Sequence, residues 1–502
     1  MSLRTLAAFV LVSLPLASIA QAAPGGPMPP KTWVDKDTGH RVWRLSDEPN
    51  SGGFYFNVNA YTPDGKQMIY TAPDGIHVLD LATRSTKLLV PNPPRPEKAV
   101  GAGASVPGGR GPGAGMVHAL VVGNKTNSVF YTKTDPATGI AAVYKADTNT
   151  GAIRKLVDLQ AKRFIVSVNA DETLAAGTYV EGDAAGREYG SNLPAPSQPA
   201  GTGDNRVAAE TQGPHYQPTD KGAMMEARLA ARLPLVLFTI RLEPGPNGEQ
   251  PGTETVLLHS TDWVNHLLFS PTDPTLLMYC HEGPWQKVDR IWMIHTDGTH
   301  NTLIHKRTMA MEIAGHEFWG LDGETIWYDW QYPKGEDFFL AGYNLKTGVR
   351  TAYHMQRDDW SIHFNLTRDL SLFAGDGGDP GQVARANNGE WIELFHPQLY
   401  KAGEGALNGP TFWQAGVFHP EHLVNMSHHY YRQEPNVRIS PDKSLVIFTS
   451  NMFGPSYVFG AEVVKADNPP AGDVQSTPDL ARKFNPADPP KSKDSVAPLP
   501  VR

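Results

Sequence analysis

Alternating hydrophobic and polar residues occur in short runs along most of this chain, and turn signals separate the runs. One phrase recurs: a Pro-Asp-Gly-like turn, a β-rich run ending in Tyr or Thr, a polar stretch, a second strand and an Asp/Asn-x-x-Thr-Gly turn. Its cleanest copy is "YTPDGKQMIYTAPDGIHVLDLATRSTKLLV", residues 61–90. Further copies lie at residues 124–157, 169–182, 270–305, 320–353, 366–381 and 440–464.

This rhythm predicts an all-β fold. Short alternating strands with turn signals inside a period of about 40–50 residues are typical of four-stranded antiparallel sheets arranged radially. The number of copies predicts a seven-bladed β-propeller over residues 23–465, and radial closure would protect the strand edges. A β-sandwich is the alternative, but its repeating unit does not normally keep so constant an inner motif.

Three stretches interrupt the rhythm. Residues 93–115 are rich in Gly and Pro and predict a loop. Residues 183–232 form a long insertion, and its end, "KGAMMEARLAARLP", favours a short helix that Pro234 stops. The tail at residues 466–502 is rich in Pro and poor in aromatic residues, which predicts disorder.

The first 22 residues have the layout of a secretory signal peptide: a lone Arg4, an apolar run from Leu6 to Ile19 and an Ala-Gln-Ala ending. We therefore expect a periplasmic or secreted protein. After cleavage, no segment is apolar and long enough to span a membrane.

The chain has a net charge of -8 and no obvious stripe of basic residues, which argues against nucleic acid as a partner. Cys280 is the single cysteine, so an internal disulfide and a Cys-based zinc site are excluded.

Candidate chemistry lies in the histidines, which number 18 and concentrate in the second half of the chain. Several fall at comparable places within the predicted blades, where inner strands and loops line a central funnel. Imidazoles gathered there could bind a divalent metal or move protons. The alternative is that each one caps a turn or binds a buried carbonyl. The residues concerned are His266, His281, His316, His363, His428 and His429.

Two enzyme classes are excluded by local sequence. Gly320 and Trp285 stand four positions after His316 and His281, so neither histidine begins the His-Glu-x-x-His helix of a zinc protease. The chain also has no Gly-x-Ser-x-Gly elbow of a propeller-bearing serine peptidase.

Longer phrases resemble a known family. The stretches "DWVNHLLFSP", "YCHEGPWQKVDRIWMIHTDGT", "GHEFWGLDGETIWYD", "WSIHFN" with "LFAGDGGDPG", and "EPNVRISPDKSLVIFTSN" look like the oligogalacturonide lyases, which degrade pectin. The resemblance covers about Leu235 to Val464. It implies a seven-bladed propeller with a divalent metal, typically manganese, in its funnel. The implied reaction is β-elimination at a uronate, so the expected partner is an acidic oligosaccharide.

The resemblance also assigns roles to particular residues. His266 in "VNH" matches the general base, and His316 in "GHEFW" matches a metal ligand. His281 and His363 match funnel residues that contact substrate. The substrate-holding arginine of the family is matched best by Arg232, rather than Arg228 or Arg241, although these could equally form a solvated helix face.

One departure concerns the metal. The family's Gln-x-x-His-x-His box is replaced by "YRQEPN", Tyr431 to Asn436. Glu434 and Asn436 could supply oxygen ligands and His429 an imidazole, a mixed set that suits Mn²⁺. Alternatively the metal is lost and Arg432 or Arg438 neutralises the substrate.

The chemistry explains why these residue types are needed. A proton α to a carboxylate is too weakly acidic for a side-chain base unless a metal or an arginine neutralises the carboxylate. Tryptophans could stack on sugar faces or pack the core: Trp285, Trp360 and Trp413. Two alternatives to an oligogalacturonate lyase stay open: a propeller lyase for glucuronate in ulvan or gum side chains, and a non-catalytic periplasmic binding scaffold.

Overall fold

The computed structural model describes residues 28–94, 115–182, 220–380, 388–403, 409 and 412–489. The predicted signal peptide at residues 1–22 lies outside the described residues. So do most of the Gly- and Pro-rich loop and the insertion up to residue 219.

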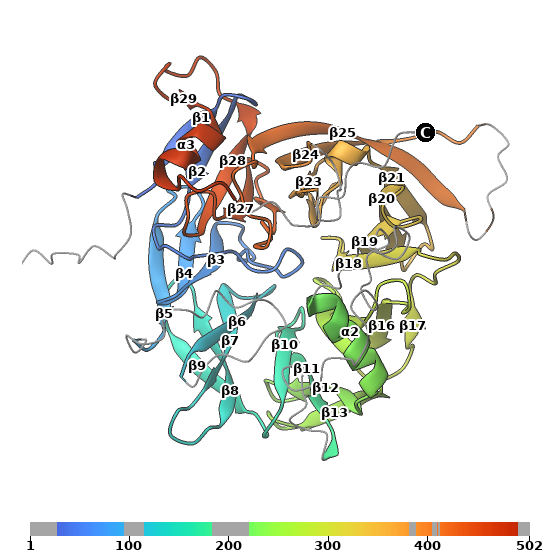
Figure 1. Cartoon of the computed structure of the whole chain (residues 1–502). Coiled ribbons are helices and arrows are strands. Elements are labelled where there is room, and N and C mark those ends of the chain that lie inside the picture. The colour runs from blue at the N-terminus through green and yellow to red at the C-terminus, as the bar shows by residue number, and fades with distance from the viewer. Residues whose placement is uncertain are drawn as a thin grey trace, which may run out of the picture.

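The described strands form seven blades around a common centre (Figure 1). This arrangement confirms the predicted β-propeller. Blade one contains β3 (Gln67–Ala72), β4 (Gly75–Asp80) and β5 (Thr86–Pro91). Blade two contains β6 (Val117–Val122), β7 (Ser128–Thr134), β8 (Ala141–Asp147) and β9 (Ile153–Asp158). Blade three contains β10 (Phe164–Val168), β11 (Leu174–Val180), β12 (Leu235–Arg241) and β13 (Glu254–Ser260). Blade four contains β14 (Trp263–Phe269), β15 (Leu276–Glu282), β16 (Ile291–His295) and β17 (Thr302–Leu303). Blade five contains β18 (Ile313–Trp319), β19 (Thr325–Gln331), β20 (Phe338–Asn344) and β21 (Arg350–His354). Blade six contains β22 (Phe364–Leu366), β23 (Phe373–Gly375), β24 (Trp391–Leu399) and β25 (Trp413–Asn425). Blade seven contains, in spatial order, β26 (Arg438–Ile439), β27 (Leu445–Ser450), β28 (Tyr457–Lys465), β2 (His40–Arg44), β1 (Thr32–Asp35) and β29 (Val474–Gln475).

The recurring turn motif has a simple physical basis. In the copy at residues 147–151, Asp147 Oδ1 accepts hydrogen bonds from the backbone N–H of Asn149 at 3.0 Å and of Thr150 at 2.7 Å. Gly151 then takes a φ of 75°, a left-handed conformation that costs glycine little. The Asp side chain and the Gly backbone thus close the hairpin between β8 and β9.

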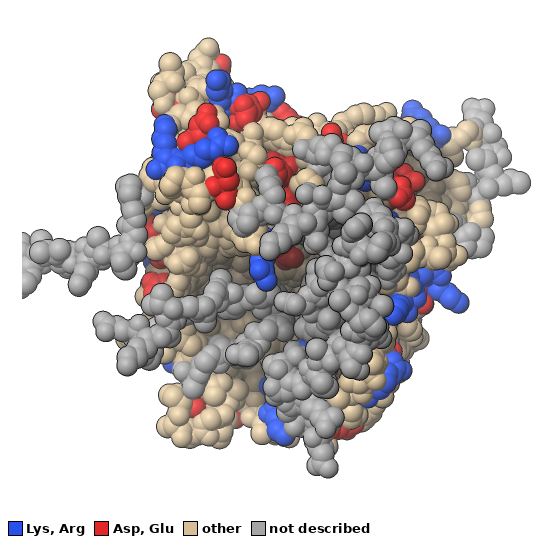
Figure 2. Space-filling view, viewed as in Figure 1, with Lys and Arg blue, Asp and Glu red and all other residues tan. Residues whose placement is uncertain are grey.

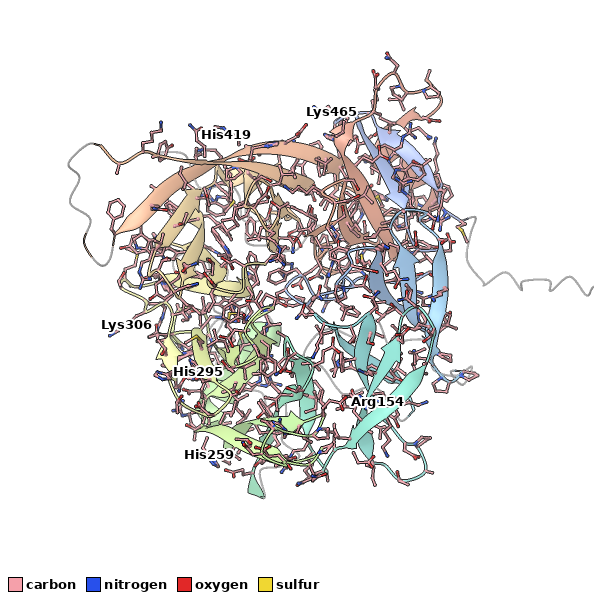
Figure 3. All side chains as sticks on the ribbon, turned by 180° about the vertical axis from the view of Figure 1, so that it is seen from behind. Arg154, His259, His295, Lys306, His419 and Lys465 are labelled. Carbon is pink, nitrogen blue, oxygen red and sulfur yellow. The ribbon has the colours of Figure 1, made fainter. Side chains whose placement is uncertain are left out.

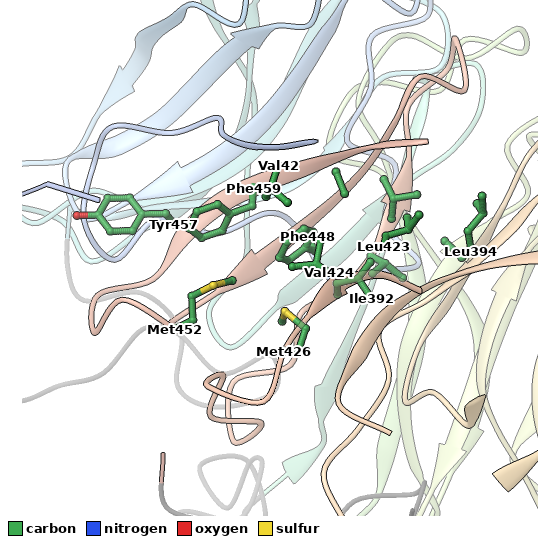
Figure 4. Close-up of a cluster of buried hydrophobic side chains, with 14 of the residues drawn as sticks. Val42, Ile392, Leu394, Leu423, Val424, Met426, Phe448, Met452, Tyr457 and Phe459 are labelled. Atoms are coloured by element: carbon green, nitrogen blue, oxygen red, sulfur yellow. The ribbon is translucent and has the colours of Figure 1, made fainter. Parts of the chain in front are cut away.

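Blade seven joins the two ends of the described chain. β2 pairs antiparallel with β28. β1 lies between β2 and β29; it pairs antiparallel with β2 and in parallel with β29. Blades five and six are also joined, because β21 pairs in parallel with the long strand β25. The hydrophobic core lies between the blades, and the cluster between blades six and seven packs Ile392 and Leu423 near Phe448 and Phe459 (Figure 4).

The beginning of the tail is ordered, contrary to the prediction for residues 466–502. β29 pairs with β1, and α3 (Thr477–Phe484) buries Leu480 and Ala481 in the core of blade seven. Thr477 accepts a hydrogen bond from Trp33 Nε1 at 2.7 Å and donates one to Asp35 at 2.8 Å. Because the tail as a whole is rich in Pro, its composition gave no sign of this short amphipathic helix. The apolar side chains of the helix pack against the core of blade seven.

α2 (Asp220–Ala231) ends the insertion, as its Ala-, Leu- and Met-rich sequence predicts. It lies on the face of the ring shown in Figure 1, beside the centre.

Within the described residues, no helix combines the length and apolar character needed to cross a bilayer. Acidic and basic residues alternate over the coloured surface in Figure 2, and the basic residues labelled in Figure 3 are spread around the rim. The coloured surface in Figure 2 contains no broad field of one charge.

Candidate functional site

Two neighbouring blades present a histidine at the same kind of backbone irregularity. The register of β14 with β15 shifts between Asn265 and Leu268, and that of β18 with β19 shifts between Gly315 and Phe318. His266 and His316 lie in these shifts with φ values of 49° and 47°. A left-handed conformation costs a non-glycine residue about 1–2 kcal/mol, and such strain clusters at functional sites. The two bulges turn both imidazoles out of the ladder.

His316 lies beside two other rings. Its ring centroid is 4.9 Å from that of Trp285 and 5.1 Å from that of His363. Its Nδ1 atom is 3.4 Å from Oδ1 of the buried Asp329. Neither of these two atoms makes a hydrogen bond to another described residue.

His363 is also backed by a buried aspartate. Its Nδ1 atom lies 2.9 Å from Asp376 Oδ2, while its Nε2 atom lies 3.2 Å from the Tyr55 hydroxyl and 3.8 Å from Glu434 Oε2. Phe56 stacks on the imidazole at 4.4 Å. An imidazole that donates Nδ1–H to a carboxylate keeps Nε2 available as an acceptor or a metal ligand.

Tyr55 links His363 to His266, whose ring centroid lies 5.8 Å from that of the phenol. Burial, followed by the charges of Glu434 and Glu317, raises the pKa of Tyr55 well above its ordinary value. The phenol therefore stays protonated and donates to Nε2 of His363. We call Tyr55, His266, His316, His363 and Glu434 the funnel cluster.

His266 is partly accessible, with 22% of its side chain exposed, and its Nε2 atom lies 3.6 Å from Glu282 Oε2. Arg290 is buried nearby. Burial alone would lower its pKa, but the charges of nearby groups, among them Glu317 and Glu282, raise it. Arg290 therefore remains a positive charge beside the funnel cluster.

The predicted catalytic Arg232 belongs to a different group. Its side chain is 53% exposed and forms an ion pair with Asp262. Asp262 in turn lies 3.7 Å from His281, and the His281 ring stacks on Trp292 at 4.9 Å. His281 lies on β15 beside β14, which carries His266. Within the described residues, however, no ion pair or ring contact joins Arg232 or His281 to the funnel cluster. The alternative arginine, Arg228, packs over the ring of Trp263 at 3.6 Å.

The structure does not assemble the four metal ligands that the sequence suggested. His429 is buried with both ring nitrogens engaged, Nδ1 by Ser450 at 3.0 Å and Nε2 by the Gln433 carbonyl at 2.7 Å. Burial lowers the pKa of His429 to about 4, so it is a neutral structural residue. Asn436 is engaged as well: its Oδ1 accepts from the backbone of Phe56 at 3.1 Å. We therefore leave His429 and Asn436 out of the metal site.

The two arginines considered as substitutes for the metal differ. Arg438 is buried and donates to the backbone carbonyls of Phe54 and Val58, so it holds the segment that carries Tyr55. Arg432 is exposed and forms no ion pair within the described residues. Only Arg432 is thus accessible to an anionic ligand.

Of the three tryptophans considered for sugar stacking, one lies at the site. Trp285 contacts His316, and the Arg290 guanidinium lies 4.2 Å from its ring centre. Trp360 is buried against Phe338 in the core, and Trp413 stacks on Trp330 at 4.9 Å.

Sequence reasoning missed the aspartates behind the histidines and the phenol between them. Asp329 and Asp376 each interrupt an otherwise apolar stretch, "TIWYDWQ" and "LFAGDGG", and a charged residue within a buried strand is a signal that could have found them. Tyr55 carries no such signal, because it is 308 positions away from its partner His363.

Together these features define a seven-bladed β-propeller with a strained, carboxylate-backed histidine cluster, of a kind suited to a charged ligand. Residues 248–466 match the sequence model of the oligogalacturonate lyase family, which confirms the family resemblance over this part of the chain.

Individual relatives agree with this match. The oligogalacturonide lyase of Pectobacterium atrosepticum is 26% identical over 226 residues, and the oligogalacturonate lyase of Dickeya dadantii is 26% identical over 220 residues. Each alignment covers 42% of this chain and 53% of the relative, so the chain spans about half the length of these curated relatives.

Solved structures support the fold over a longer range. An oligogalacturonate lyase in complex with manganese superposes with a TM-score of 0.61 and 20% identity, covering 88% of this chain and 99% of that one. The Vibrio parahaemolyticus oligogalacturonate lyase gives a TM-score of 0.58 and 20% identity, covering 86% of this chain and 96% of that one.

Proposed function

We propose that the protein is a lyase that cleaves oligogalacturonides by β-elimination. The observation that carries this proposal is the position of His266. It is a partly exposed imidazole on a strained bulge, beside a second histidine bulge and close to the buried Arg290. The names of the matching relatives supply the substrate class.

His266 acts as the general base in this proposal. The C5 proton of a uronate is α to the carboxylate, and its removal places negative charge on the carboxylate oxygens. An imidazole has an ordinary pKa near neutrality, which is the range a general base needs. Glu282, 3.6 Å from Nε2, stabilises the imidazolium once the proton has been taken.

The substrate carboxylate then needs positive charge beside it. The buried Arg290 provides a fixed charge beside the cluster, and the exposed Arg432, two residues before Glu434, is a second candidate. Trp285 contacts both Arg290 and His316, and it is our candidate for stacking on the sugar.

The funnel cluster also offers donors for a divalent metal, with a ligand set that differs from the sequence prediction, although the ligand atoms of His316, His363 and Glu434 do not all lie within 4.8 Å of one another. His363 is oriented by a hydrogen bond to the buried Asp376, as metal-binding histidines are, and His316 faces the buried Asp329 at 3.4 Å, while Glu434 lies 3.8 Å from His363. These three residues would hold the ion once it takes the place of the Tyr55 hydroxyl at His363 Nε2, and Mn²⁺ suits such a mixture of imidazole and carboxylate. When bound, the ion would supply Lewis-acid stabilisation of the substrate carboxylate.

The reaction balances without an added reactant. His266 takes the C5 proton, the electron pair forms the C4–C5 double bond, and the C4–O bond breaks with its pair going to oxygen. That oxygen takes up a proton and leaves as a hydroxyl. The products are one shortened sugar and one unsaturated uronate.

The test is the ultraviolet absorbance of the unsaturated uronate, together with a colour assay for keto-deoxy products, on galacturonate and glucuronate oligomers. His266→Ala should lower turnover at least about 10³-fold. The matched control is His259→Ala, because His259 is an exposed histidine on the rim and should keep full activity (Figure 3). Chelator and added Mn²⁺ test the metal.

Three outcomes decide the proposal. Product from galacturonate oligomers that disappears with His266→Ala supports it. Product from glucuronate oligomers alone would move the substrate to ulvan-like or gum side chains. Absence of product from every uronate by a folded protein would contradict the lyase and favour a binding scaffold.

A further inference from the structure

Three metal-binding side chains gather in blade six, apart from the funnel cluster. They are Asp359, at the end of the 3₁₀-helix η3 (Arg357–Asp359), Glu393 on β24 and His422 on β25. One ligand atom from each lies within 4.8 Å of the other two. Within the described residues, this is the one group of three His, Cys, Asp or Glu side chains that converges so closely.

The fold holds these residues firmly. Glu393 and His422 face each other across the β24–β25 ladder, at a register shift that follows Ile392. Trp391 stacks on the His422 ring at 4.3 Å and 7°. Their chain neighbours Ile392, Leu394, Leu423 and Val424 belong to the hydrophobic cluster in Figure 4. A bulge between packed strands is a common way to aim a side chain at a site.

The environment of Glu393 lacks what a buried carboxylate needs. Its side chain is 0% exposed, and neither oxygen makes a hydrogen bond to a described residue. The nearest base is His422, whose Nε2 atom is 3.3 Å from Oε1. Asp359 is buried as well, and Asp358 adds further negative charge. Burying uncompensated carboxylates is unfavourable, so this arrangement calls for additional positive charge.

We propose that Asp359, Glu393 and His422 bind a divalent metal ion, with Zn²⁺ as the best match. One imidazole nitrogen and two carboxylate oxygens form a common ligand set for such an ion. The two carboxylates balance the charge of the ion, and the ligating oxygen of Glu393 gains a partner. The His422 side chain is 34% exposed, which leaves room for water as a fourth ligand.

The ion would fasten η3 to the outer strands of blade six. η3 leads directly into the segment that carries His363 of the funnel cluster. The site is structural and uses none of the residues proposed for catalysis, so it stands or falls independently of the lyase.

The experiment measures zinc bound to the full chain after removal of metals with a chelator, by equilibrium dialysis against Zn²⁺ followed by elemental analysis. We expect Glu393→Gln to lose one equivalent of bound zinc. His316→Ala should keep this equivalent, which separates the site from the funnel. The matched control is His396→Gln, because His396 is an exposed histidine of β24 that lies 3.5 Å from Glu421.

Thermal unfolding provides a second readout. A saturating ligand raises the melting temperature of the state it binds, so Zn²⁺ should raise it by about 2–5 °C in the wild type and in His316→Ala. Glu393→Gln should lack this shift while its metal-free melting temperature is at least that of the wild type, because a buried acid has been removed. If Glu393→Gln folds poorly, Asp359→Asn serves for the same comparison.

Equal zinc content and an equal thermal shift in Glu393→Gln and the wild type would overturn the proposal. So would the absence of any bound zinc in His316→Ala. In either case a proton on the carboxylates, rather than a metal, balances the charge of the cluster.

Discussion

Blade five and the loop that leads into it contain two histidine–carboxylate pairs that differ in how completely they are hydrogen-bonded. Glu312 accepts from His305 Nε2 at 2.7 Å, from Trp330 Nε1 at 2.9 Å and from the backbone of Met309 at 3.1 Å, and the backbone of Thr308 also donates to it. Four positions later, His316 lies 3.4 Å from Asp329, and the two facing atoms make no hydrogen bond within the described residues.

The difference separates a structural pair from an available one. Burial alone would raise the pKa of Glu312, but the hydrogen bonds from His305, Thr308 and Trp330 lower it to about 2. That carboxylate has no remaining capacity for a ligand. His316 sits on a strained bulge and keeps its ring available. A histidine beside an acid is therefore informative about function only when its partners are incomplete.

The largest effect is expected at the available pair. His316→Ala should lower turnover of oligogalacturonate by about 10³-fold while the melting temperature changes by no more than about 2 °C, because the side chain helps to hold not the blade but the metal that stabilises the substrate carboxylate. Steady-state kinetics and thermal unfolding of the same preparation check both parts. A large loss of stability with normal turnover would erase the distinction between the pairs.

Glu312→Ala should show the reverse behaviour. Removal of the carboxylate leaves several buried donors without an acceptor, which should lower the free energy of unfolding by about 3 kcal/mol. Turnover per folded molecule should stay near that of the wild type. Denaturant unfolding gives the first quantity and active-site-normalised kinetics the second; an unchanged unfolding midpoint would show that the pair is not structural.

The same carboxylate predicts a pH dependence. The pKa of Glu312 is lower in the folded protein, about 2, than its ordinary 4.5, so the folded state binds fewer protons than the unfolded state between these values. Its contribution is complete above about pH 5 and is lost as the pH falls toward 2, by up to about 3 kcal/mol. Denaturant unfolding across this range should be flatter for Glu312→Gln. Parallel curves for the two proteins would contradict the assignment.

The smallest effect is expected from the aspartate behind His316. Asp329→Asn preserves the shape but weakens the orientation of the imidazole, and loss of such a supporting group typically costs about 10-fold in activity or metal affinity. The pH profile of turnover should change along with its magnitude, which a purely structural role would not produce. Restoration of activity by Asp329→Glu would sharpen the point.

The sequence predicted the fold well because the propeller is a local, repeated pattern. The hairpins, their Asp and Gly turns and the helix before Pro234 all follow from residues close together in the chain. The tail was different: Leu480 and Ala481 are too few to stand out among prolines, and their order depends on the distant blade seven.

The candidate site was predictable only in part. His266, His316 and His363 carry recognisable phrases and do gather, whereas His429 looks equally suitable in the sequence but is occupied by Ser450 and Gln433. Residue type cannot reveal which lone pairs are already used. The position of Tyr55 beside His266, and the approach of Asp359 to β24 and β25, depend on how distant parts of the chain fold together. Neither leaves a local signal in the sequence.

Blade seven has a consequence for the life of the chain in the cell. Its strands come from both ends of the described protein, with β1 held between β2 and β29. β29 and α3 follow all the other described strands in the chain, so blade seven cannot be completed until they have left the ribosome. The funnel histidines, although made much earlier, can meet Tyr55 in their final arrangement only after the last blade has closed.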